Sequence, residues 1–166
     1  MMNFKKLSLT AALFATAFAA QAATPQVDFT VEAVIPDNSF YVVTSNGWES
    51  QPQKMRWDEP SMSVIESDPG KQLKMKNTSG GIKAYLASAP VLTSAGSTSV
   101  IPLEVSVAGK KLPVGSATAV ELYNAAAATE KTATMAINQN GKLDDRPDAG
   151  NYMGSVTMIF DTVPAS

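Results

Sequence analysis

Apolar residues occupy every second position of one stretch near the start of the chain, QVDFTVEAVIP at residues 26–36. The apolar positions are Val27, Phe29, Val31, Ala33 and Ile35. Because a period of two sends alternate side chains to opposite faces of an extended strand, this stretch predicts a strand with one apolar face. At about 3.3 Å per residue the strand is roughly 30 Å long. Its face must pack in its own domain or in another chain, and the pattern leaves both interpretations open.

Short runs rich in β-branched and aromatic residues follow, separated by turn signals such as Asp68-Pro69-Gly70 and Ser79-Gly80-Gly81. The runs cover residues 40–44, 54–57, 73–76, 82–87, 101–107, 135–137 and 152–161. About seven short strands at regular spacing predict one all-β domain, an antiparallel sandwich of immunoglobulin type. Pro102 inside its run predicts an edge strand or a bulge. Residues 117–129 fit either a helical turn or a loop.

Residues 1–22 are typical of a secretory signal peptide. Lys5 and Lys6 precede an uncharged apolar run at residues 7–20, and Ala20-Gln21-Ala22 is a small-x-small cleavage site, which predicts cleavage between Ala22 and Ala23. The apolar run is shorter than the roughly 20 residues of a membrane-spanning helix. We therefore expect an exported domain that begins at Ala23.

Charge and cysteine content narrow the classes of partner. Outside the predicted signal peptide, 11 basic residues face 15 acidic ones, and the basic residues are not clustered. Nucleic acid and anionic membranes are therefore not expected partners. The sequence has no cysteine, although small exported domains often depend on disulfides. Contacts between subunits are another source of stability for a domain of this kind.

The sequence offers little chemistry for catalysis. It has no histidine and no cysteine, which excludes Ser-His-Asp and Cys-His sites and thiolate or imidazole metal ligands. The densest acidic cluster, at residues 144–148, fails as a calcium loop, because Gly141 at the sixth position puts Ala136 at the first and Pro147 at the twelfth. Asn140-Gly141 instead predicts a solvated hairpin turn. We expect no enzyme activity, no cofactor and no metal site.

Two tryptophans and the C-terminal run complete the candidate residues. Trp57 alternates with Met55 and is expected in the core, whereas Trp48, which follows Gly47 in a polar loop, is expected to be exposed. In the last run, one face of an extended strand carries five residues at period two. These are Tyr152, Gly154, Val156, Met158 and Phe160.

Three segments resemble the subunits of alternate chaperone–usher fimbriae, the class 5 or alpha type that includes colonisation factor antigen and coli surface antigen pili. They are FTVEAVIP, the stretch IKAYLASAPVLTSAGSTSVIPLEVSVAGKKL at residues 82–112, and AGNYMGSVTMIF at residues 149–160. The AGNY-x-G-x-V ending is the most specific of the three. Together they follow the order and spacing of the family's major subunits over most of the chain.

The resemblance implies an incomplete immunoglobulin-like domain at residues 37–166, preceded by a donor-strand extension at residues 23–36. It implies that Val27, Phe29, Val31, Ala33 and Ile35 complete the groove of the next subunit. It also implies that Tyr152, Gly154, Val156, Met158 and Phe160 flank that groove and pair with a periplasmic chaperone. Gly154 would then mark a close approach to the chaperone, or alternatively a bulge in the domain's own core.

The implied function is that of a structural fimbrial subunit on the surface of a Gram-negative bacterium. Its implied partners are identical subunits, a periplasmic chaperone, an outer-membrane usher and a tip adhesin, and the fibre supports adhesion to host cells or surfaces. Two alternatives stay open: a minor or tip subunit, and a monomeric exported immunoglobulin-like binding module whose first strand pairs within its own sheet.

Overall fold

The computed structural model describes residues 38–164. The predicted signal peptide, its cleavage site at Ala22 and Ala23, and the strand at residues 27–35 lie outside the described residues. The strands of the described part are β1 (Phe40–Thr44), β2 (Met55–Asp58), β3 (Ser63–Glu66), β4 (Lys71–Asn77), β5 (Gly80–Leu86), β6 (Val91–Thr93), β7 (Val100–Val107), β8 (Lys110–Lys111), β9 (Val120–Tyr123), β10 (Lys131–Gln139) and β11 (Met158–Pro164). Three short 3-10 helices connect them: η1 (Trp48–Ser50), η2 (Ser116–Thr118) and η3 (Ala125–Ala128).

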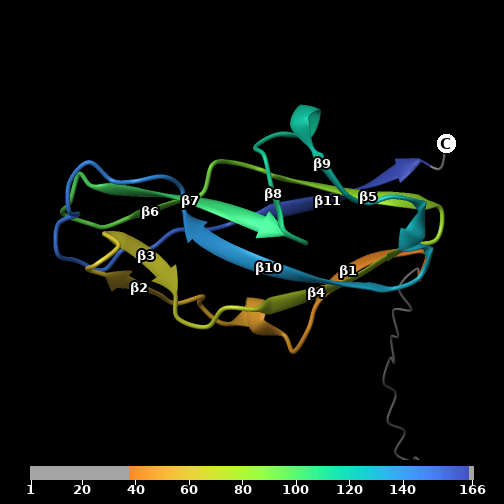
Figure 1. The fold of residues 1–166 in the computed structure, drawn as a ribbon, viewed down its shortest axis with the longest axis horizontal. Coiled ribbons are helices and arrows are strands. Elements are labelled where there is room, and N and C mark those ends of the chain that lie inside the picture. The colour runs from red at the N-terminus through yellow and green to blue at the C-terminus, as the bar shows by residue number, and fades with distance from the viewer. Residues whose placement is uncertain (1–37, 165–166) are drawn as a thin grey trace, which may run out of the picture. The chain divides into compact units, whose positions relative to one another are not determined.

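The strands form two principal antiparallel sheets (Figure 1). The larger sheet has the order β1-β4-β10-β7-β6, with β8 paired to β7, and the smaller sheet has the order β11-β5-β9. A separate hairpin, β2-β3, lies next to β10, where the Val64 N–H donates to the Gln139 side chain at 3.0 Å. The prediction of an all-β antiparallel sandwich is confirmed.

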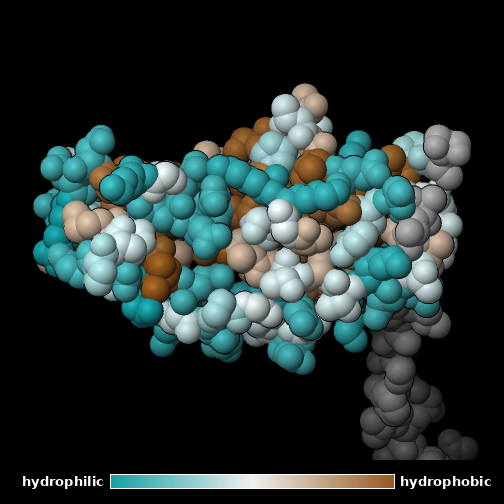
Figure 2. Space-filling view, in the orientation of Figure 1, coloured by the Kyte–Doolittle hydropathy of each residue, from teal (hydrophilic) through white to brown (hydrophobic). Residues whose placement is uncertain are grey.

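The core forms because the central strands alternate apolar and polar residues. In β4, β7 and β10 every second side chain is buried, which gives each strand one core face and one outer face. The fully buried side chains include Met75, Ile82, Leu86, Val105, Val107 and Met135. On the face drawn in Figure 2, hydrophobic residues emerge near β8 and β9, and hydrophilic residues cover most of the rest.

A buried asparagine shapes the crossing from one sheet to the other. Asn77, at the end of β4, has 1% of its surface exposed. Its amide donates to the Gly81 carbonyl at 2.7 Å, and its side-chain oxygen accepts the Ser79 N–H at 3.0 Å. These bonds satisfy a polar side chain that would be costly to bury alone. They therefore stabilise the turn between β4 and β5, where the chain passes from one sheet to the other.

Two local predictions are wrong. Pro102 lies neither in an edge strand nor at a bulge, because β7 is flanked by β10 and β6 and neither pairing shows a register shift. The proline is tolerated because registered pairing with β10 has ended at Leu103. Asn140-Gly141 does not make a hairpin either. Gly141 has a φ of +82°, as a turn requires, but β10 pairs with β4 and β7, and a long irregular segment follows it.

The segment at residues 117–129 contains 3-10 turns, as one of its two interpretations allowed, and also a strand, which neither interpretation included. It holds the end of η2, the short strand β9, and the 3-10 turn η3. Among the described residues, no helix is long and apolar enough to cross a membrane.

Candidate functional site

Each principal sheet ends in a strand with an unpaired edge. Among the described residues, β1 pairs only with β4, and β11 pairs only with β5. An unpaired edge presents backbone N–H and C=O groups that another strand can join. A groove of about 840 Å³ is lined by residues of both edge strands and of the core.

The floor of this groove is apolar and comes from the larger sheet. Its side chains include Leu73 of β4, Ile101 and Leu103 of β7, and Met135 and Ile137 of β10, all nearly buried. One wall consists of β1, residues 48–53, and β2 with the side chains of Met55 and Trp57. The other wall is formed by residues 146–160.

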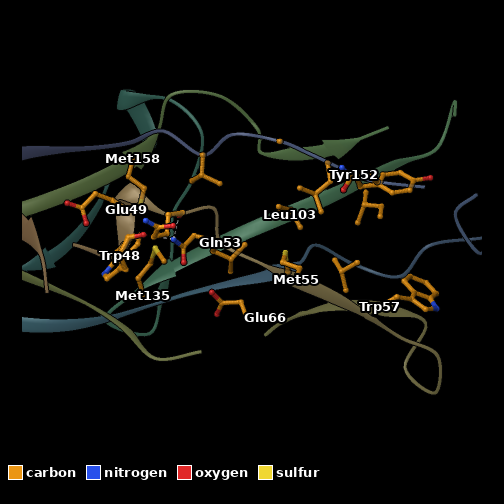
Figure 3. Close-up of a pocket in the computed structure, with 18 of the residues that line it drawn as sticks. Trp48, Glu49, Gln53, Met55, Trp57, Glu66, Leu103, Met135, Tyr152 and Met158 are labelled. Carbon is orange, nitrogen blue, oxygen red and sulfur yellow. Dashed lines mark hydrogen bonds between the residues drawn. The ribbon is translucent and has the colours of Figure 1, made fainter. Parts of the chain in front are cut away.

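Figure 3 shows how the residues are distributed along the groove. Trp48, Glu49 and Met158 lie towards one end, and Trp57 and Tyr152 lie at the other. Met55, Leu103 and Glu66 lie between them. The groove therefore has a Met158 end and a Tyr152 end, and these names are kept below.

The C-terminal face predicted from the sequence lies along the second wall. All five of its residues line the groove: Tyr152, Gly154, Val156, Met158 and Phe160. Met153, which falls between them, points away and is 68% exposed. The strand itself is shorter than the prediction, because continuous pairing with β5 begins only at Met158.

Residues 152–157 are instead anchored to β6. Met153 and Thr93 exchange two backbone hydrogen bonds of 2.8 and 2.9 Å. Gly154 packs directly against Val91, so that a Cβ added to it would lie 3.2 Å from the Leu92 side chain and still closer to the Val91 backbone. Within the domain, Gly154 therefore makes its close approach to Val91 of β6.

The two tryptophans both line the groove. Trp57 is half-buried and packs against the core, as predicted. Trp48 is also half-buried, so the prediction that it is exposed is wrong. Its ring nitrogen donates to the Gln72 carbonyl at 3.0 Å, which fixes the ring against β4. A single tryptophan in a polar loop gives no periodic signal from which this could have been found.

Charged residues of the groove were not found by sequence reasoning. Glu66 lines it and forms an ion pair of 3.3 Å with Lys71, with side-chain exposures of 7% and 5%. Lys71 also donates to the Asp68 carbonyl, so both charges are compensated. Glu49 accepts from the Thr44 hydroxyl at the Met158 end. No signal in the sequence identifies these pairs, because the Glu66–Lys71 contact depends on the turn between β3 and β4 and the Glu49–Thr44 contact on the turn between β1 and η1.

The Tyr152 end is closed by a loop, residues 146–152, which is held on two sides. Arg146 pairs with Glu59 of the β2-β3 turn at 3.4 Å, and the same Glu59 oxygen accepts the Trp57 ring N–H at 2.5 Å. On the other side Asp148 accepts the Ser97 hydroxyl at 2.7 Å, and the Tyr152 hydroxyl donates to the Asp148 carbonyl at 3.0 Å. The contacts with Glu59 and Ser97 join the loop to neighbouring turns, and the Tyr152 bond lies within the loop.

Two groups outside the groove have shifted pKa values. Hydrogen bonds from Ser61 hold the pKa of Asp58 below its usual value, which favours the charged acceptor that orders the β2-β3 turn. The hydroxyl of Tyr41 donates to Glu130 at 2.5 Å, and this bond raises the pKa of Tyr41. In the part of the chain searched, residues 38–164, no group of three or more acidic side chains could hold a metal ion.

Comparison with known proteins identifies the family of this chain. No curated protein matches the chain. A solved structure, titled "Structure of the CooA pilin subunit from enterotoxigenic Escherichia coli", is similar to it at a TM-score of 0.51 and 17% identity, over 77% of this chain and 90% of that chain. This similarity supports the immunoglobulin-like pilin fold.

The family model described as "CS1 type fimbrial major subunit" matches residues 25–161, most of the chain. It is a family of structural fimbrial subunits and not of enzymes, and a major fimbrial subunit assembles with identical copies into a fimbria at the cell surface. This chain belongs to the CS1 type fimbrial major subunit family.

Proposed function

We propose that this chain polymerises head to tail by donor-strand exchange. In this proposal residues 23–36 of one copy form the donor strand, and residues 37–166 of the next copy form the domain that receives it. Val27, Phe29, Val31, Ala33 and Ile35 enter the groove. A periplasmic chaperone occupies the groove first, an outer-membrane usher assembles the fibre, and a tip adhesin completes a fimbria that supports adhesion.

One observation carries the proposal: the apolar groove lies between two sheet edges, β1 and β11, that have no paired strand on their outer side in the described chain. A strand placed there can form backbone hydrogen bonds with an edge while its alternate side chains enter apolar pockets. The segment at residues 27–35 has the required alternation. It carries five apolar positions at period two, and the wall at residues 152–160 has five groove-facing positions at the same period.

The direction of the donor strand follows from the same geometry. Every registered strand pair in the described sheets is antiparallel, and antiparallel pairing is slightly more stable per residue than parallel pairing. We therefore place the donor strand antiparallel to β11. Matching the five positions on each side puts Val27 beside Phe160, at the Met158 end, and Ile35 beside Tyr152.

Burial of the donor face supplies the driving force. Each large apolar side chain that leaves water contributes roughly 1.5–3 kcal/mol, and Val27, Phe29, Val31 and Ile35 are large. An empty groove of this kind is an aggregation hazard, because it combines exposed apolar side chains with open sheet edges. A chaperone that covers Tyr152, Gly154, Val156, Met158 and Phe160 before assembly would remove that hazard.

A self-complemented chain tests the proposal. The variant carries an additional copy of residues 24–36 after Ser166, joined by a short flexible linker. Because β11 runs from Met158 towards Pro164, a short linker returns the added strand antiparallel to β11, whereas a parallel strand would first have to span the groove, roughly 30 Å. The added strand docks at high effective concentration. We expect a monomer that no longer polymerises and melts at a markedly higher temperature than the chain without the addition.

The matched controls are the unmodified mature chain, a chain without residues 23–36, and an added strand with Val31→Asp. The unmodified chain should form ladders of oligomers that survive mild detergent, and the truncated chain should be proteolysed or aggregate. The altered strand should neither stabilise the chain nor block polymerisation. A stable, monodisperse full-length monomer that the added strand does not change would refute donor-strand exchange. It would favour the monomeric binding module.

A further inference from the structure

We propose that Arg146 pairs with Glu32 of the incoming donor strand and so fixes its register. The proposal rests on the donor-strand exchange proposed above and adds a charge interaction to its apolar one. The occupant is the segment at residues 27–35 of a second copy. Arg146 is a positioning residue in this inference, because it acts on the strand's placement.

The charges of the groove and of the donor segment are complementary at one place. The donor segment carries two acids, Asp28 and Glu32, and no basic residue. Among the described residues that line the groove, Arg146 is the only basic one. The groove's acids are Glu49, Glu66 and Asp148. An acidic donor strand therefore meets a single positive charge, in the loop that closes the Tyr152 end.

All three groove acids already have a partner in the described chain: Glu49 accepts the Thr44 hydroxyl, and the other two are held by Lys71 and Ser97. Glu66 is paired with buried Lys71, and Asp148 accepts the Ser97 hydroxyl at 2.7 Å. Glu49 is exposed and lies towards the Met158 end. The charge profile along the groove therefore has Glu49 at the Met158 end, and Arg146 together with Asp148 in the loop at the Tyr152 end.

The antiparallel register places the two donor acids differently in this profile. Glu32 falls between the residues beside Val156 and Gly154, in the half of the groove next to the Arg146 loop. Asp28 falls between the residues beside Phe160 and Met158, on the side of Glu49. Four residues separate the acids, about 13 Å along a strand, which exceeds the screening length of about 8 Å at physiological salt. Arg146 can thus attract Glu32 without acting appreciably on Asp28.

Arg146 is available for this contact. Its side chain is 60% exposed, and its present partner Glu59 also holds the Trp57 ring N–H. Exposed pairs of this kind are weak, so Arg146 can turn towards a second carboxylate at little cost. A shift of the donor by two residues would keep its apolar face in the groove but move Glu32 by about 7 Å. The ion pair therefore distinguishes registers that the apolar alternation alone does not.

Charge exchange in the full-length chain tests the inference, since each copy of a polymer carries both the donor strand and the groove. The variants are Arg146→Glu, Glu32→Arg and the two together. The control pair combines Arg146→Glu with Asp28→Arg. The measurement is the rate at which purified oligomers dissociate at a fixed guanidinium concentration. Oligomers of each single variant should dissociate about two- to fivefold faster than those of the parent, as expected for loss of one exposed pair.

The double variant Arg146→Glu with Glu32→Arg should return to within about twofold of the parent rate, and the Asp28 control should not. Glu59→Gln tests whether Arg146 acts only by holding its loop in place. This substitution removes the ion pair between Arg146 and Glu59 and leaves Arg146 available to the donor strand. If Glu59→Gln reproduces the Arg146 effect and the Glu32 exchange gives no rescue, the inference is overturned. Rescue by Asp28→Arg in place of Glu32→Arg overturns it as well.

Two further measurements allow the result to be interpreted when a variant is not recovered or does not form oligomers. If a charge-reversed chain is not recovered, Arg146→Gln and Glu32→Gln form a neutral cycle, in which the double variant should dissociate no faster than either single variant. Val31→Asp in the same assay tests donor-strand exchange itself. Normal oligomers from Val31→Asp would refute that function, whereas their loss without charge rescue would refute only the pairing of Arg146 with Glu32.

Discussion

Replacing Gly154 with alanine should destabilise the subunit itself, independently of any partner. A Cβ at this position would lie 3.0 Å from the Val91 carbonyl carbon, 3.2 Å from the Leu92 side chain, and closer still to the Val91 oxygen. The obstacle is backbone, which cannot rotate away as a side chain can. Either β6 moves or residues 152–157 leave the groove wall.

The magnitude follows from what must be disturbed. Overpacking costs typically 1–3 kcal/mol, and the two hydrogen bonds between Thr93 and Met153 contribute about 0.5–1.5 kcal/mol each. A net loss of about 3 kcal/mol is expected, which for a domain of this size lowers the melting temperature by about 10 °C. The assay is thermal unfolding of the self-complemented monomer, in which assembly does not contribute.

Gly150→Ala is the matched control. A Cβ there would meet the Ser94 hydroxyl at 2.8 Å, at the end of a side chain that can rotate. Both substitutions reduce the conformational entropy of the unfolded chain equally, so this contribution to stability cancels between them. Gly150→Ala should change the melting temperature by only a few degrees. Equal melting temperatures for the two variants would show that Gly154 is not packed against Val91 as the structure has it.

Three further outcomes can be measured. Val31→Asp should abolish polymerisation on a native gel, because it puts a charge on the apolar donor face, whereas Thr30→Asp on the opposite face should polymerise; equal behaviour would contradict the face assignment. Lys71→Met should lower the free energy of unfolding by about 3–5 kcal/mol in urea titrations, because it leaves the buried Glu66 unpaired, and adding Glu66→Leu should restore most of the loss. The hydrogen bond that raises the pKa of Tyr41 contributes stability fully below the usual tyrosine pKa of about 10 and loses it as the pH rises through the raised value. The melting temperature of Tyr41→Phe should therefore fall less steeply between about pH 9 and 11 than that of the parent. Identical slopes of melting temperature against pH would contradict the assignment.

The residues that could be predicted from the sequence are those whose periodicity determines their position. Strand β1 has the predicted bounds, and β4, β7 and β10 lie where alternation placed them, because each buries one face in the core. The groove face at residues 152–160 follows the same period. It lines the groove even though only its last part pairs with β5.

The parts that could not be predicted depend on tertiary contacts. β6 has three residues and β8 two, too few to show a period, and they are strands because β7 offers them an edge. Trp48 lies in the three-residue helix η1 and Arg146 in a loop, and their places in the groove come from contacts with Gln72 and Glu59, which are distant in sequence. The sandwich could thus be predicted from local sequence patterns, and the loop that closes the Tyr152 end of the groove could not.

The groove also gives a physical reason why this domain can do without a disulfide. Its core is made by side chains of β4, β5, β7 and β10, and the walls of the groove carry half-buried apolar side chains that pack on that core, among them Met55, Met158 and Phe160. Apolar surface that a monomer leaves accessible to water contributes to stability only when a strand covers it. Under donor-strand exchange, assembly therefore completes the fold, and each bound neighbour stabilises it by mass action. A covalent cross-link would stabilise the empty and the filled subunit alike, whereas a missing strand makes the filled state the stable one. The expected consequence is a large gap in melting temperature between the unassembled and the self-complemented chain, because one donor strand then supplies stability that the isolated domain lacks.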